Sequence, residues 1–144
     1  LSSMSRNITD NSITFINLEN GVTYEYRTRA INKVGNGPWS NSISAIPFTV
    51  PDKVQNLMGV PWPEAVDLSW DTPNNNGKPI LSYKYEQTVG NKTVTGQLDP
   101  TPTSHTISGL VNGQTYSFRM RASNAAGNGP WSGSISVRIG RQNL

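Results

Sequence analysis

The chain contains an internal repeat with a period of 92 residues. Residues 12–47 align with residues 104–139 without a gap, and 20 of the 36 positions hold the same residue. The longest identical string is "GNGPWS", at residues 35–40 and again at residues 127–132. Self-similarity at a fixed spacing is typical of chains built from copies of one structural unit. The two copies are therefore expected to share one fold.

The repeat also predicts where the copies begin and end. The second copy starts near Pro51 and is expected to form a complete domain over residues 51–140. One period earlier lies upstream of Leu1, so residues 1–50 are expected to be the C-terminal part of a first domain, its last strands only. Residues 141–144 are expected to be a tail or the start of a next linker. The proline-bracketed segment "FTVPDK" is expected to join the two copies.

Apolar and polar residues alternate along the second copy, and helical periodicity is missing. "AVDLSW" places Val66, Leu68 and Trp70 on one face, and "YSFRMRA" directs Tyr116 and Phe118 inward in the same way. Clusters of Gly, Pro, Asn and Asp separate these segments. Short alternating strands with turns at this spacing predict an antiparallel sandwich. Seven strands are expected, near residues 54–60, 64–70, 79–88, 91–97, 103–108, 114–123 and 132–139.

Several segments together resemble the fibronectin type III family. They are "VPDKVQNL", "VDLSW", "GKPILSYKY" and "LVNGQTYSFRMRASNAAGNGPWS", with "LENGVTYEYRTRAINKVGNGPWS" in the first copy. The resemblance implies an all-β, immunoglobulin-like, seven-stranded antiparallel β-sandwich. Such domains usually stand in tandem, usually outside the cell or on a surface, and are usually non-catalytic. The resemblance also places Trp70, Tyr83 and Tyr85 in the core.

Two tyrosines occupy the position of a tyrosine corner. Tyr24 and Tyr116 each follow the pattern L-x-N-G-x-T at the start of a predicted strand. In a tyrosine corner the phenol forms a hydrogen bond with the backbone a few residues upstream. Both tyrosines are therefore predicted to hold a turn in place.

The "R-x-R" and "GNGPWS" segments predict a contact between tryptophan and arginine in each copy. Residues two apart on a strand point to the same side, and a guanidinium over an indole gives cation–π attraction. The arrangement is similar to half of the Trp-Ser-x-Trp-Ser motif of cytokine-receptor members, and the second tryptophan of that motif is missing. The alternative is a solvent-facing tryptophan for sugar or protein contacts. The predicted Trp–Arg clamps are Trp39 with Arg27 and Arg29, and Trp131 with Arg119 and Arg121.

Four further residues are candidates on weaker grounds. Trp62, between two prolines, is expected to pack at the inter-domain joint, with an exposed contact as the alternative. His105, the only histidine, is expected to be a half-buried strand residue. Asn7 and Asn91 fit the glycosylation acceptor pattern.

The composition excludes several classes of function. The chain has no cysteine, so thiolate metal sites, disulfides and cysteine nucleophiles are excluded. The net charge of +3 is scattered, which argues against nucleic-acid binding. No apolar run is long enough for membrane insertion. The acidic residues lack metal-ligand spacing, and no catalytic constellation surrounds the histidine. No cofactor, metal or catalytic activity is expected.

Two functions from different classes remain. The first is a non-catalytic structural or interaction module, a segment of a longer array in a surface, adhesive or virion-fibre protein. Its location would be extracellular, on a cell or on a virion, and its partners other proteins, neighbouring repeats or surface carbohydrate. The alternative is an accessory spacer or binding module of a secreted polysaccharide-active enzyme.

The incomplete first copy raises a separate question of partners. Three strands would leave the apolar face of Tyr24, Tyr26 and Ile43 without an opposing sheet, and so small a piece rarely stabilises itself. The missing strands are expected upstream in the same polypeptide. The alternative is strand addition from another molecule.

Overall fold

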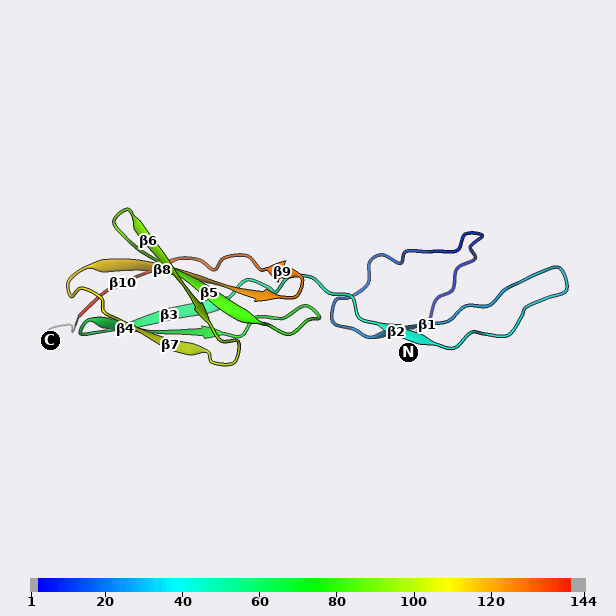
Figure 1. Cartoon of the computed structure of the whole chain (residues 1–144), viewed down its shortest axis with the longest axis horizontal. Helices are drawn as coiled ribbons and strands as arrows, with labels where there is room; N and C mark the ends of the chain where they lie inside the picture. The colour runs from blue at the N-terminus through cyan, green and yellow to red at the C-terminus, as the bar shows by residue number, and fades with distance from the viewer. Residues whose placement is uncertain (1–2, 141–144) are drawn as a thin grey trace.

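The computed structural model describes residues 3–140, so the predicted tail at 141–144 lies outside the described residues. All elements within residues 3–140 are strands, and every paired strand is antiparallel. Two bodies lie end to end, a first body over residues 3–50 and a second sandwich over residues 51–140 (Figure 1). The predicted all-β antiparallel sandwich is confirmed.

Two sheets form the second sandwich. One has the order β3–β4–β7, and the other has the order β10–β8–β5–β6, with β9 pairing only with β8. The seven predicted strands are all found, and the short β9 is an addition. Their bounds are β3 Gln55–Trp62, β4 Ala65–Asp71, β5 Ser82–Val89, β6 Lys92–Leu98, β7 Ser104–Ser108, β8 Thr115–Asn124, β9 Gly127–Asn128 and β10 Ile135–Arg138.

The core of the second sandwich lies between these sheets. Alternate residues of β4 and β8 are buried, because successive side chains of a strand point to opposite faces. Tyr83 of β5 is fully buried, and its ring centroid lies 5.4 Å from that of Trp70 on the facing sheet. Tyr85 is half-buried and packs against the same cluster. Trp70 and Tyr83 therefore lie in the core, whereas Tyr85 lies at its edge.

The first body has two short strands, β1 Tyr24–Tyr26 and β2 Ile43–Ala45, and not the three that the sequence predicts. Residues 12–16 are the counterpart of β7, and they form no strand. In the second sandwich β7 pairs with β4, and residues 3–50 contain no counterpart of β4. Ile43 is 68% exposed for the same reason, since no second sheet covers β2 within the described residues.

No described element is a helix with the length and apolar character needed to cross a membrane.

Candidate functional site

In the second sandwich, Trp131 lies between two arginines of β8. The Cζ atoms of Arg119 and Arg121 are 4.4 Å and 4.3 Å from the indole centroid. Both arginines project from the outer face of the sheet, because the intervening Met120 is buried in the core. Arg119 Nε also donates a hydrogen bond to Glu86 Oε1 on the neighbouring β5. Two strands and the following loop thus hold this clamp together.

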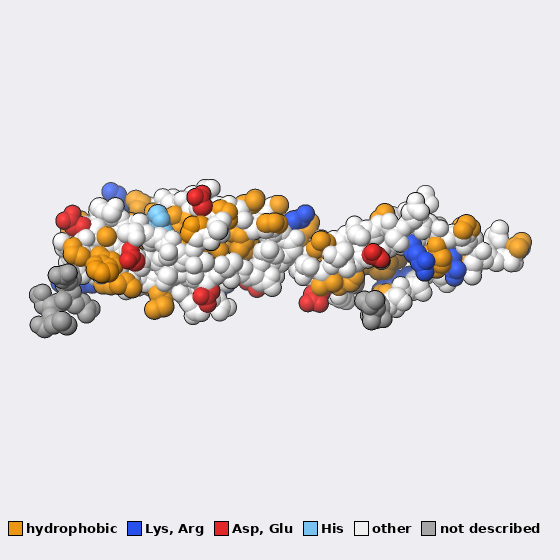
Figure 2. All heavy atoms as spheres, turned by 90° about the horizontal axis from the view of Figure 1, so that it is seen from below, with side chains coloured by type: hydrophobic (Ala, Val, Ile, Leu, Met, Phe, Trp, Pro, Cys, Tyr) orange, Lys and Arg blue, Asp and Glu red, His pale blue; other side chains and the backbone are white. Residues whose placement is uncertain are grey.

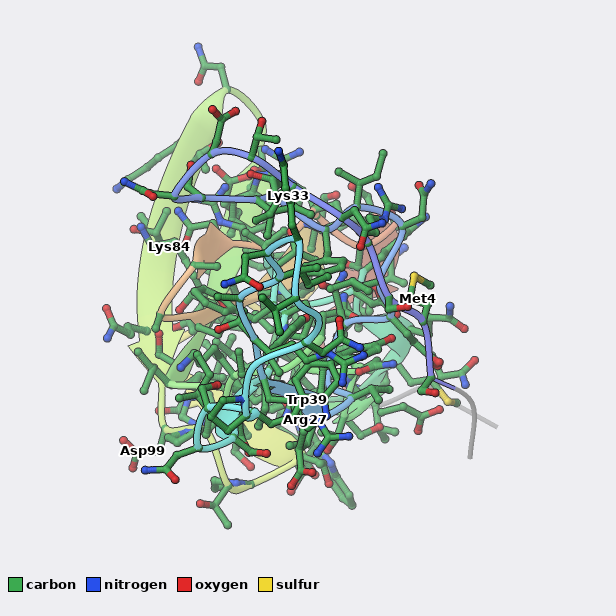
Figure 3. The ribbon with its side chains drawn as sticks, turned by 90° about the vertical axis from the view of Figure 1, so that its right-hand side faces the viewer. Met4, Arg27, Lys33, Trp39, Lys84 and Asp99 are labelled. Atoms are coloured by element: carbon green, nitrogen blue, oxygen red, sulfur yellow. The ribbon has the colours of Figure 1, made fainter. Side chains whose placement is uncertain are left out.

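The first body contains the same arrangement. The Cζ atoms of Arg27 and Arg29 are each 4.2 Å from the centroid of Trp39, and Figure 3 shows Arg27 beside this indole. Trp39 remains 42% exposed. Within the described part of the chain, neither arginine has a carboxylate partner like Glu86. The structure thus brings together the three residues of each predicted clamp.

The serine after each tryptophan completes this module, and sequence reasoning missed it. Met120 N donates to Ser132 Oγ at 2.9 Å, and Ser132 N donates to Met120 O at 2.8 Å. The first body repeats both bonds, from Thr28 N to Ser40 Oγ at 2.9 Å and from Ser40 N to Thr28 O at 2.7 Å. The available signal was the serine itself, which follows the tryptophan in both copies. Local interactions therefore determine the conformation of "GNGPWS".

Both tyrosines form the predicted backbone contact. Tyr116 Oη accepts a hydrogen bond from Val111 N at 3.1 Å, and Tyr24 Oη accepts one from Glu19 N at 2.9 Å. Each bond closes a turn five residues upstream of the tyrosine. Tyr116 is buried, whereas Tyr24 is half-buried. The hydroxyl at each corner thus holds the backbone of a turn.

The expectation that Trp62 packs between the two copies is wrong. Strand β3 begins at the joint and runs away from it, so Trp62 lies at the opposite end of the second sandwich. There its carbonyl oxygen accepts a hydrogen bond from Gly140 N at 3.1 Å. Its Nε1 donates to Asp67 Oδ2 at 2.8 Å, and the residue is 47% exposed.

The remaining sequence candidates lie at the surface. His105 is exposed and not half-buried as expected, because β7 is an edge strand of its sheet. Its ring centroid lies 6.1 Å from that of Tyr85. Asn7 and Asn91 are both exposed, which modification of either would require.

The sequence located the joint between the two bodies at "FTVPDK" but did not reveal the contacts that hold it. The linker residues Thr49–Asp52 run along the turn that connects β4 to β5. Thr49 N donates to Asn76 O, and Asp52 N donates to Asn74 O, each at 3.0 Å. Asn76 Nδ2 donates to Val50 O at 2.9 Å. The linker is thereby bonded along its length to the second sandwich.

Asn124 closes the joint from the other side. Its side chain is buried, and Nδ2 donates to Thr49 O at 2.8 Å and to Asn75 O at 2.9 Å. Its Oδ1 accepts from Ala126 N at 2.8 Å, which shapes the turn before "GNGPWS". One amide side chain thus connects three segments, and an unpaired buried amide would cost free energy.

Gly77 brings the same turn against the first body. A Cβ at this position would lie 2.5 Å from Pro47 O and 2.9 Å from Phe48 Cβ, so no side chain fits. Lys78 Nζ lies 4.8 Å from the ring centroid of Phe48. The Asn and Gly residues of "NNNGK", at residues 74–78, thus form the contact between the copies. We regard this joint, together with the two clamps, as the candidate functional site.

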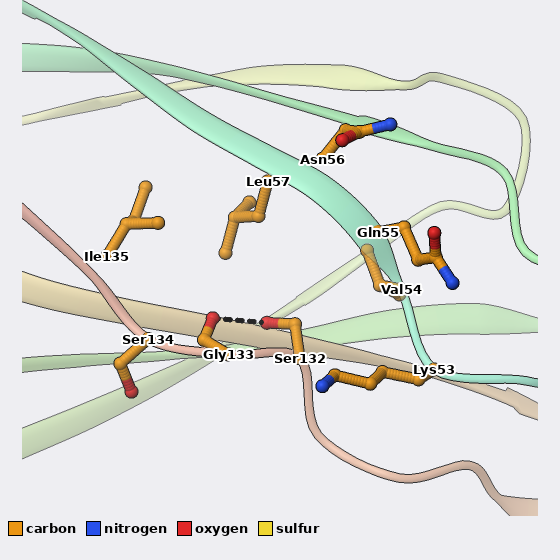
Figure 4. Close-up of a pocket in the computed structure, with 9 residues that line it drawn as sticks. All are labelled: Lys53, Val54, Gln55, Asn56, Leu57, Ser132, Gly133, Ser134 and Ile135. Carbon is orange, nitrogen blue, oxygen red and sulfur yellow. Dashed lines mark hydrogen bonds between the residues drawn. The ribbon is translucent and has the colours of Figure 1, made fainter.

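The second sandwich also has an open groove on its surface. A groove of about 360 Å³ lies between the start of β3 and the segment before β10, with Lys53, Leu57 and Ser132 among its lining residues (Figure 4). Lys53 is the one ionisable residue that lines it. Within residues 3–140, no group of three His, Cys, Asp or Glu residues is placed to hold a metal ion.

Comparisons with known proteins agree with this architecture. Residues 52–138 match the family model "Fibronectin type III domain". The chain is 37% identical over 93 residues to Protein sidekick-1 of Gallus gallus, covering 60% of this chain and 4% of that protein. It is 29% identical over 132 residues to Fibronectin type-III domain-containing protein 3A of Pongo abelii, covering 84% of this chain and 11% of that protein. The chain therefore spans a small part of these relatives.

A solved structure shows the same fold. The FN1–FN3 domains of chicken CNTN1 superpose with a TM-score of 0.58 at 18% sequence identity, over 87% of this chain and 45% of that one. At this identity the likeness concerns the fold alone. The model match covers more than half of the chain and includes the tyrosine corner, the Trp–Arg clamp and both sheets of the second sandwich. The chain belongs to the fibronectin type III family.

Proposed function

We propose that the chain is a non-catalytic structural and interaction segment of a tandem array in an extracellular, cell-surface or virion-surface protein. Its role is to hold successive domains in a fixed relation, so that the array can present its surfaces to protein partners. The observation that carries this proposal is the joint between the first body and the second sandwich.

Mobile linkers are the ordinary case between domains of one chain. Here the linker is restrained, because its backbone is bonded to the turn at Asn74–Gly77 and to the side chain of Asn124. Pro51 is fully buried within the same segment and fixes one backbone angle. Because the linker is held by these bonds, the two bodies are expected to act together as a stiff spacer.

The Trp–Arg clamps support the same role. Each clamp packs an indole against two guanidinium groups, and in the second sandwich both arginines belong to β8. Cation–π contacts of this kind contribute about 0.5–1 kcal/mol each at exposed sites. The clamps are therefore expected to stabilise each copy, which fits a structural role.

The experiment that tests the proposal uses an antibody raised against the second sandwich on the source material. We expect a polypeptide well above 15.7 kDa, with further copies of the repeat in its peptide map. We also expect surface protease to remove the signal from intact cells or particles. A full-length product without other copies, or one that is protected inside the cell, would refute the proposal. A hydrolase domain in the same polypeptide would favour the accessory module instead.

A further inference from the structure

The chain contains five Asn–Gly pairs, and a pair of this kind can react with itself. The backbone nitrogen of the glycine attacks the side-chain Cγ of the asparagine, since glycine has no side chain to hinder the approach. A C–N bond forms, and the amide nitrogen leaves as ammonia with the proton of the attacking N–H group. Water then opens the cyclic imide to give aspartate or isoaspartate. The pairs begin at Asn20, Asn36, Asn76, Asn112 and Asn128.

The fold engages the attacking nitrogen of each pair in a hydrogen bond. Four of the five glycine N–H groups donate to a backbone carbonyl oxygen of a neighbouring segment, as Gly113 N does to Ile139 O at 2.8 Å. Gly77 is the exception, because its N–H group donates at 2.9 Å to the side chain of Asn75, two residues earlier. This bond holds the nitrogen only while the turn keeps its shape. A local motion of the turn is therefore enough to release it.

The side-chain amide of Asn76 is held by the linker. Its Nδ2 atom donates to Val50 O at 2.9 Å and to Asp52 Oδ1 at 2.8 Å, and both acceptors belong to the segment that joins the two bodies. Nδ2 is also the leaving group of the reaction, so it must give up both acceptors before ammonia can depart. The closed joint therefore opposes the reaction at Asn76, and an open joint permits it.

The joint depends on few contacts. Figure 2 shows the two bodies meeting at a narrow waist. The turn fits closely there, since a Cβ on Gly77 would lie 2.5 Å from Pro47 O. A contact of this size can open while both bodies stay folded, and the fraction of open molecules then determines how fast Asn76 reacts.

The product of the reaction does not fit the closed joint. A carboxylate at residue 76 has no N–H group for Val50 O, and it would face the carboxylate of Asp52 at the length of the present hydrogen bond. Like charges at this separation repel, and the carbonyl oxygen loses its donor. Isoaspartate also lengthens the main chain of the turn, where a Cβ on Gly77 would already overlap Pro47 O.

We propose that Asn76 is a deamidation site controlled by the joint, and that its product holds the joint open. Opening permits the reaction, and the reaction prevents closure, so a transient loss of the joint becomes permanent. The reaction consumes water, releases ammonia and requires no cofactor. This inference goes beyond the proposed function, because it states how a stiff linker is converted into a mobile one.

The first experiment measures the rate of the reaction at each pair. The chain is incubated at mildly alkaline pH and digested with pepsin in acid, and tandem mass spectrometry locates each deamidated asparagine. The double variant Thr49→Pro, Asn124→Ala removes the bonds from Thr49 N to Asn76 O and from Asn124 Nδ2 to the linker. We expect deamidation of Asn76 to become about tenfold faster, the effect of losing two ordinary hydrogen bonds on the open population. Asn112, in the same sandwich, should react at an unchanged rate.

The second experiment measures the joint itself. The protein has no cysteine, so Ser44→Cys and Thr95→Cys can carry spin labels without background. Pulsed electron paramagnetic resonance then gives the distance distribution between the two bodies. We expect it to be narrow in the otherwise unsubstituted chain and broad both in the double variant and in Asn76→Asp, which introduces the product carboxylate. Asn112→Asp is the matched control, because it keeps the oxygen that accepts from Glu64 N and lies outside the joint.

The outcomes separate this inference from the proposed function. A narrow distribution in Asn76→Asp would overturn the inference, and so would a rate at Asn76 that does not rise in the double variant. Equal rises at Asn76 and Asn112 would also overturn it, because the reaction would then follow the stability of the whole sandwich. Each of these results leaves the stiff spacer standing. A broad distribution in the otherwise unsubstituted chain would overturn both.

Discussion

The hydroxyl oxygen of Tyr116 accepts the one hydrogen bond that defines its tyrosine corner. Tyr116→Phe removes the acceptor of the Val111 N–H group at a buried position. We expect the free energy of unfolding of the second sandwich to fall by about 1 kcal/mol, the usual net value of one hydrogen bond. Urea denaturation followed by tryptophan fluorescence measures the change.

Tyr24→Phe is the matched control for this variant. Tyr24 makes the same bond with Glu19 N, but in the first body and at a less buried position. Its substitution should leave the unfolding midpoint of the second sandwich unchanged. Equal shifts for the two variants would show that the hydroxyl of Tyr116 has no local role.

Trp131 is expected to contribute more than a tryptophan without arginine neighbours. Trp131→Ala removes a half-buried indole and its contacts with Arg119 and Arg121. We expect a loss of about 1–3 kcal/mol in unfolding free energy, from lost burial and cation–π attraction. Trp62→Ala, at an exposed site, should cost less, and the two proteins can be compared by thermal unfolding. The clamp hypothesis fails if Trp62→Ala costs as much.

The sequence predicts the contacts of some residues in the clamps and the joint, and not those of others. The Trp–Arg contacts follow from strand alternation, because Arg119 and Arg121 must share a face next to the following loop. The roles of Ser132 and Asn124 do not follow, since their partners are backbone groups that only the folded structure brings near. A side chain that bonds to a backbone group far away in the sequence produces no recognisable spacing between residue types.

Strand β6 contains a glycine for a packing reason. Gly96 lies opposite Tyr85 of β5, and the Tyr85 ring occupies the space where a Cβ at Gly96 would stand. Gly96→Ala should therefore displace the ring and lower the unfolding free energy by about 1–3 kcal/mol, as overpacking does. Gly133→Ala is the control, because its Cβ meets open space. Equal melting temperatures of the two variants would contradict this account.

The strands themselves were largely predictable, and the misses have a common cause. Alternation and the turn clusters between segments located all seven strands of the second sandwich. Alternate residues of β4 and β8 are buried, whereas β6 contributes only Leu98 to the edge of the core. It failed at residues 12–16, where the apolar pattern is present and the pairing strand is not. It also started β10 too early, because residues 132–134 follow the bonds of Ser132 instead of the regular ladder. An alternating apolar pattern therefore forms a strand only where a neighbouring strand is present to pair with it.

At the level of the whole chain, the contacts that hold the joint could not be predicted, because each residue that makes them has an ordinary alternative role. Asn and Gly are common in turns whether or not another domain contacts them. The repeat offers a comparison that separates these roles. Asn32 and Asn124 occupy the same position in the two copies, and both accept hydrogen bonds from the following turn. In the described part of the chain only Asn124 also donates to a linker.

Asn124→Ala is therefore expected to loosen the joint. It leaves Thr49 O and Asn75 O without their donor, so the linker loses its attachment on one side. With spin labels at Ser44 and Thr95, the distance distribution should broaden relative to the unsubstituted chain. Asn32→Ala, which removes only the turn contact, should leave it narrow. Tyr116→Phe destabilises the second sandwich away from the joint and should also leave it narrow, which separates loss of the joint from loss of stability. If the distribution stays narrow in Asn124→Ala, the linker is held by its other bonds, to the backbone of Asn74 and Asn76 and to the side chain of Asn76.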